Sequence, residues 1–99
     1  MIDDELSRAV VAYIRGAGLA WPHRSLDAVA AAMGAAAAER FGPQLKPLAD
    51  EMLHWPVDWD RLDLLAAMEV VRNGFAEHHP ELSSTAVDAL VWEFSYVYR

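Results

Sequence analysis

Residues 83–99 read SSTAVDALVWEFSYVYR, and this stretch decides the fold class. Its aromatic residues alternate between Trp92 and Tyr98, a pattern that is also typical of a β-strand. Its apolar residues as a whole recur at helical spacing: Val87, Leu90, Val91, Phe94 and Val97. A single strand would also lack a partner in the rest of the chain. We therefore predict a terminal helix with its N-cap at Ser83 or Ser84, in an all-α protein.

Glycines, prolines and capping residues upstream of this stretch divide the chain into four more helices. Their expected ranges are about 3–15, 25 to 40 or 41, 44–54, and 58 or 60 to 76. Ser25 is the expected N-cap of the second helix, and Gly42 with Pro43 is expected to end it. The fourth helix is apolar nearly all round from Leu62 to Phe75, so we place it at the centre of a five-helix bundle.

The chain has 99 residues, of which 55% are hydrophobic, and this suffices for a single domain, residues 1–99, with its own core. It carries 15 acidic and 8 basic side chains, for a net charge of -7. Proteins that bind nucleic acid or anionic membranes need a basic face, so we expect neither partner. The absence of cysteine excludes disulfides and thiolate metal sites.

We expect no targeting signal in this sequence. Residues 1–5, MIDDE, have the wrong charge for a secretory signal peptide. The most apolar run, residues 28–38, is too short to span a bilayer. We therefore expect a cytoplasmic protein.

The negative charge is unevenly distributed. Residues 1–49 carry five acids and five bases, whereas residues 50–99 carry ten acids and three bases. The densest part interleaves acids with tryptophans: Asp50, Glu51, Trp55, Asp58, Trp59, Asp60 and Asp63. Acidic clusters speed association with a basic partner, and tryptophans supply affinity. We expect these residues to bind a basic protein; the alternative is a solvated face that confers solubility.

A second candidate patch lies on the terminal helix. Trp92 and Tyr96 fall on a face beside the predicted core stripe, and both residue types are enriched at interface hot spots. The alternative is that this face packs against another helix. A third possibility is a homodimer formed through this face or through the alanine-rich face of the second helix.

Residues that could carry out chemistry are scarce. His78 and His79, with His54 as a distant third ligand, could hold a metal, but neighbouring residues on a helix point about 100° apart. We therefore expect no metal and no other cofactor. Glu69 is isolated in an apolar run, and we expect an arginine such as Arg72 to pair with it. No nucleophile elbow, P-loop or dinucleotide-binding pattern is present, so we do not expect an enzyme.

Two segments of the C-terminal half resemble a known class of proteins. Residues 58–63, DWDRLD, lead into a long helix, and residues 82–99 open an aromatic-rich terminal helix. With these two segments, the chain is similar to the small acidic immunity proteins of bacterial contact-dependent and polymorphic toxin systems. The resemblance implies a non-enzymatic inhibitor that masks a basic partner such as a toxin.

A shorter resemblance surrounds Ser25. Residues 25–29, SLDAV, followed by residues 39–42, ERFG, are similar to the region around the prosthetic-group serine of acyl carrier proteins. That resemblance implies a phosphopantetheine arm on Ser25. The chain departs from the carrier motif at Arg24, where carrier proteins have aspartate. A structural homo-oligomer with no external partner is the remaining alternative.

Overall fold

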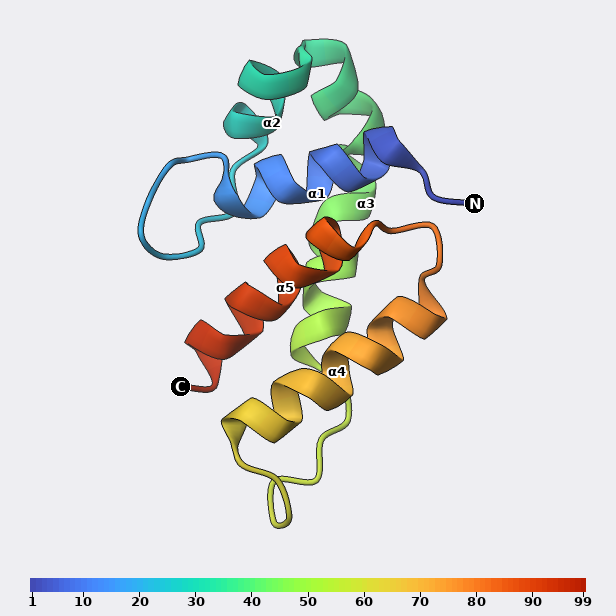
Figure 1. Ribbon diagram of the computed structural model, residues 1–99. Helices are drawn as coiled ribbons and strands as arrows, with labels where there is room; N and C mark the ends of the chain where they lie inside the picture. The colour runs from blue at the N-terminus through green and yellow to red at the C-terminus, as the bar shows by residue number, and fades with distance from the viewer.

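The computed structural model describes all 99 residues, and it is all-α, as the sequence predicts (Figure 1). Its five helices are α1 (Asp4–Arg15), α2 (Leu26–Met33), α3 (Ala35–Leu53), α4 (Leu64–His78) and α5 (Ser84–Val97). The strand alternative for the C-terminal aromatics is wrong, because α5 continues as a helix to Val97. No helix combines the length and the apolar character needed to cross a membrane.

Side-chain N-caps begin four of the helices. The capping residues are Asp3, Ser25, Asp63 and Ser83, and each accepts a hydrogen bond from the backbone N–H three residues later. The predicted caps at Ser25 and Ser83 are therefore confirmed. The cap of α4 is Asp63 rather than Asp58 or Asp60, because the chain first makes a separate turn in which the N–H groups of residues 61 and 62 donate to the carbonyl of Asp58.

The predicted helix end at Gly42 is wrong. α2 ends instead at Gly34, whose φ of 98° only glycine adopts readily, and α3 then runs through Gly42, Pro43 and Pro47. The buried side of α3 continues past both prolines as one stripe: Phe41, Leu45, Ala49 and Met52. Burial of this stripe outweighs the local tendency of a Gly-Pro pair to end a helix.

The central helix is α5, and the prediction that the fourth helix is central is wrong. α5 lies between α1 and α4, and α3 crosses behind them (Figure 1). Eight of its residues are buried: Ala86, Val87, Ala89, Leu90, Val91, Glu93, Phe94 and Ser95. α4 packs mainly against α5 and buries one stripe, formed by Ala67, Val71 and Phe75. Leu64 and Met68 are partly buried beside this stripe, whereas Leu65 and Val70 are exposed.

The one-sided packing of α4 also places Glu69 in solvent. The expected pairing of Glu69 with Arg72 does not form. Arg72 instead pairs with Asp88 of α5, with 2.9 Å between Nε and Oδ1. Glu69 is therefore neither a buried carboxylate nor part of an ion pair.

Candidate functional site

Asp50, the first residue of the predicted acidic patch, is paired with two basic residues of the same chain while its side chain remains 35% exposed. Lys46 Nζ donates to Oδ2 at 2.7 Å, and Arg24 Nη1 donates to Oδ1 at 2.7 Å. These hydrogen bonds, that of Lys46 first, lower the pKa of Asp50 from 3.8 to about 2. Arg24 also donates two hydrogen bonds to Glu93 of α5, and these chiefly raise the pKa of Arg24 well above its ordinary value. Asp50 thus joins α3 to the connector before α2 rather than offering its charge to a partner.

Glu51 is engaged as well, by histidines from the end of α4. Its Oε2 lies 2.6 Å from His79 Nε2 and 4.0 Å from His78 Nε2. The ligand atoms of these three side chains all lie within 4.8 Å of one another, and no other group of histidines and acids in the chain comes together in this way. Glu51 therefore belongs to a cluster of its own, apart from the acids of the α3–α4 loop.

Trp55 serves the packing of α4 rather than a free surface. Its ring meets Phe75 edge to face at 5.7 Å and His78 at 5.8 Å between centroids. The indole also lies against Gly74, where a built Cβ would stand 3.0 Å from it. A side chain at position 74 would therefore press on the indole and require it to shift by a few tenths of an ångström. The half-buried ring of Trp55 therefore contributes to the packing of α4.

The aspartates of the loop between α3 and α4 differ in what they do. Asp63 Oδ1 accepts the N–H of Ala66 at 2.8 Å, so this carboxylate caps α4. Asp58 and Asp60 are both exposed. Asp58 makes one loose ion pair with Arg61, at 3.5 Å between exposed side chains. Such a pair is worth little and exchanges easily with another cation.

Trp59 stands between these two aspartates and rests on the end of α5. Its ring stacks on Phe94 at 6.0 Å with an interplanar angle of 11°, and on Tyr98 at 5.3 Å. Its outer side remains in solvent, with 44% of the residue exposed. The Tyr98 hydroxyl donates to the carbonyl of Leu53 and thereby holds the second ring in place. We call the exposed side of Asp58, Trp59, Asp60 and Tyr98 the Trp59 surface.

Tyr98 was missed by the sequence analysis. A usable signal was present, because Phe94 and Tyr98 are four residues apart and lie on one side of a helix. Nothing in the sequence indicated that Trp59 would fold back onto that side.

The second predicted patch lies elsewhere on α5. Trp92 and Tyr96 contact each other edge to face at 5.6 Å, and both are half-buried. The guanidinium of Arg15 lies 4.2 Å from the Trp92 ring centroid, and the Tyr96 hydroxyl donates to the carbonyl of Ala20. Residues 92 and 94 point about 200° apart on a helix, so the structure does not join this patch to the Trp59 surface. Its main contacts are with the end of α1 and the connector that follows.

Ser25 acts as the N-cap of α2. Its Oγ accepts the N–H of Ala28 at 3.0 Å, and its own N–H donates to the carbonyl of Tyr13. This local role accounts for a serine at the start of the helix.

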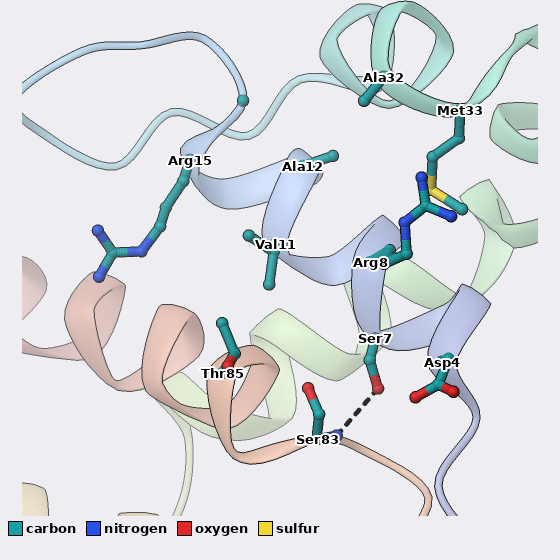
Figure 2. Close-up of a pocket in the computed structure, with 11 residues that line it drawn as sticks. Asp4, Ser7, Arg8, Val11, Ala12, Arg15, Ala32, Met33, Ser83 and Thr85 are labelled. Atoms are coloured by element: carbon teal, nitrogen blue, oxygen red, sulfur yellow. Dashed lines mark hydrogen bonds between the residues drawn. The ribbon is translucent and has the colours of Figure 1, made fainter.

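An open groove of about 780 Å³ runs between α1, the end of α2 and the start of α5 (Figure 2). Its lining combines apolar residues, including Met33, with Arg8 and Arg15. Figure 2 shows Ser7 at its lower edge, where Oγ accepts the N–H of Ser83 at 2.9 Å. This serine supports the turn before α5 and has no general base hydrogen-bonded to it.

Comparison with known proteins assigns no family. The chain matches no protein-family model, and it has no significant match among curated proteins or solved structures. The residues on its surface are therefore the basis for inferring its function.

Proposed function

We propose that this protein is a non-enzymatic binding module that docks a basic protein on the Trp59 surface. The observation that carries the proposal is the position of Trp59, which is stacked on Phe94 and Tyr98 yet remains 44% exposed. A large ring held in place before binding loses little conformational entropy when a partner covers it. Exposed tryptophan and tyrosine are also the residue types that dominate interface energetics.

Charge argues for a basic partner. Asp58 and Asp60 flank Trp59 in sequence and are exposed, and the half of the chain that contains them carries the whole net charge of -7. A negative field of this kind raises the association rate of a positive partner and orients it as it arrives. The acids would steer the encounter, and the aromatic rings would supply most of the affinity.

The more specific form of the proposal is an inhibitor or immunity protein in the bacterial cytoplasm. A basic enzyme that acts on nucleic acid presents a positive surface, and a small acidic protein can cover it in competition with the substrate. The size, charge and helical fold of this chain support that role. The proposed contact residues are Asp58, Trp59, Asp60 and Tyr98.

The test starts with capture of partners from extract of the native host at low and high salt. The captured protein is then purified, and its association and dissociation rates are measured against the wild type and three variants. Asp58→Asn/Asp60→Asn should slow association at low salt and flatten its salt dependence. Trp59→Ala should accelerate dissociation by about tenfold or more. The control Glu39→Gln/Glu77→Gln removes the same charge from exposed sites outside the loop and should leave most of the association rate intact.

Other outcomes would overturn the proposal. An acidic captured partner would contradict it, as would a control variant that slows association as much as the aspartate variant. Self-association in sedimentation, with no captured protein, would favour the homo-oligomer. A mass increase after incubation with coenzyme A and a phosphopantetheinyl transferase, lost in Ser25→Ala, would favour the carrier protein.

A further inference from the structure

The cluster of Glu51, His78 and His79 joins the end of α3 to the end of α4 and shares no residue with the Trp59 surface. We propose that it is a binding site for a divalent transition-metal ion, of which Zn²⁺ is the natural probe. The ligand atoms of the three side chains lie within 4.8 Å of one another. Two imidazole nitrogens with one carboxylate oxygen are a donor set that zinc accepts in proteins. This inference is independent of the proposed protein partner.

Two adjacent histidines converge here because the helix ends between them. His78 is the last residue of α4, whereas His79 is its C-cap, with φ of -123° and ψ of 69°. The divergence of about 100° between neighbours holds only inside a regular helix. Outside it, the two rings come to 4.8 Å between centroids, and both Nε2 atoms face Glu51. The expectation that this pair is poorly placed to share an ion applied the divergence inside a regular helix to residues 78 and 79, where the helix ends.

The distances require only small shifts to hold an ion. Glu51 Oε2 lies 2.6 Å from His79 Nε2 and 4.0 Å from His78 Nε2. With metal–ligand bonds of about 2.0–2.2 Å in a tetrahedron, two ligand atoms stand roughly 3.3–3.5 Å apart. The Glu51–His79 distance would have to increase and the Glu51–His78 distance to decrease. A rotation of one side chain is enough for each change. Water would complete the coordination.

The surroundings already orient His79 as a ligand. Its Nδ1 lies 3.3 Å from Glu81 Oε2, so a proton on Nδ1 can be donated to that carboxylate while Nε2 presents its lone pair to the ion. The ring is packed on Phe75 at 4.5 Å, and its side chain is 15% exposed. A carboxylate behind the ligating histidine is the usual support of a zinc site. His78, 64% exposed, leaves an open side through which the ion can enter.

The experiment is a titration of the full chain, freed of any histidine tag, with Zn²⁺ by calorimetry and with Co²⁺ by visible absorption. We expect one ion per chain and a rise in the thermal midpoint, because an ion that joins α3 to α4 stabilises the folded state. His78→Gln is the informative variant, since this exposed side chain contributes little to folding. It should weaken Zn²⁺ binding by about tenfold or more and remove the thermal shift. Glu51→Gln should do the same.

The matched control is His23→Gln/His54→Gln, which removes two exposed histidines outside the cluster. This variant should bind Zn²⁺ as the wild type does. Three results would overturn the proposal: no heat and no cobalt spectrum at millimolar metal, unchanged affinity in both His78→Gln and Glu51→Gln, or equal loss in the control.

Discussion

Arg24 and Glu93 form a bidentate ion pair between residues 69 positions apart in sequence. Arg24 Nε donates to Glu93 Oε2 at 2.9 Å, and Nη2 donates to Oε1 at 2.8 Å. Glu93 belongs to the central helix, and its side chain is only 9% exposed. A carboxylate buried there needs a partner, and the connector before α2 supplies it. The pair thus fixes that connector against α5, while the third donor of Arg24 reaches Asp50 on α3.

Arg24→Ala should destabilise the protein by about 3 kcal/mol, because it leaves the Glu93 carboxylate buried and unpaired. Urea denaturation measures the effect. Arg40→Ala is the control, since the ion pair of Arg40 with Glu5 spans 3.8 Å between exposed side chains and should contribute no more than about 0.5 kcal/mol. Arg24→Met/Glu93→Leu should recover much of the loss by removing both charges. If Arg24→Ala and Arg40→Ala lowered the free energy of unfolding equally, the bidentate pair would contribute no more than an exposed ion pair.

The ion pairs of Asp50 predict a specific dependence on pH. Its pKa is lowered from 3.8 to about 2, first by Lys46 and then by Arg24. Because the folded-state pKa is the lower one, the stabilisation is fully present above pH 4 and is lost as pH falls toward 2. Titration of the Asp50 carboxyl by NMR, with a chelator present, should show a midpoint near 2. Lys46→Met should raise that midpoint toward the ordinary value, and an unchanged midpoint would contradict the assignment.

The two glycines of the α2–α3 region should respond to alanine in opposite directions. Gly34 has φ of 98° and ψ of 158°, a region that is essentially confined to glycine, so Gly34→Ala should cost about 1–3 kcal/mol. Gly42 lies inside α3, and a Cβ there would meet Leu26 at an ordinary 3.6 Å. Gly42→Ala should therefore stabilise by about 0.4–1 kcal/mol. If urea denaturation showed a change of the same sign in the free energy of unfolding for both variants, it would contradict the assignment of Gly34 to the helix boundary and Gly42 to the interior of α3.

Local signals in the sequence predict the fold class and most helix starts. The caps Ser25 and Ser83 and the helical spacing of α5 need only neighbouring residues to act, which is why they can be recognised. The continuation of α3 through Gly42 and Pro43 depends instead on burial of a stripe that crosses them. Burial of the stripe competes there with the tendency of Gly42 and Pro43 to end a helix. The residues that cover the stripe are distant in sequence, so this competition cannot be judged from the local sequence. The same applies to α4, which packs mainly against α5 and leaves apolar residues such as Leu65 and Val70 exposed.

The candidate site could likewise be predicted only in part from the sequence. Composition points to an acidic, tryptophan-rich region, but it does not separate the residues that serve the fold from those that remain free. Asp50 and Glu51 are held by Arg24 and His79, which come from other parts of the chain. Trp59 remains accessible because the loop turns it onto the end of α5. Contacts between side chains far apart in sequence decide which of these residues are held by the fold. Such contacts leave no pattern among neighbouring residues in the sequence.

The two tryptophans of the loop should separate stability from binding. Trp55→Ala should destabilise by about 3 kcal/mol, because it empties the space between Gly74 and Phe75 and leaves α4 loosely held. Trp59→Ala removes a ring that is half in solvent, so its cost should be close to that of one aromatic contact, about 1 kcal/mol. Urea denaturation of both variants measures the difference. If Trp59→Ala proved as destabilising as Trp55→Ala, Trp59 would be a structural residue, and its exposure would no longer argue for a partner. A small cost, together with accelerated dissociation of the captured protein, would instead place the function of Trp59 in binding.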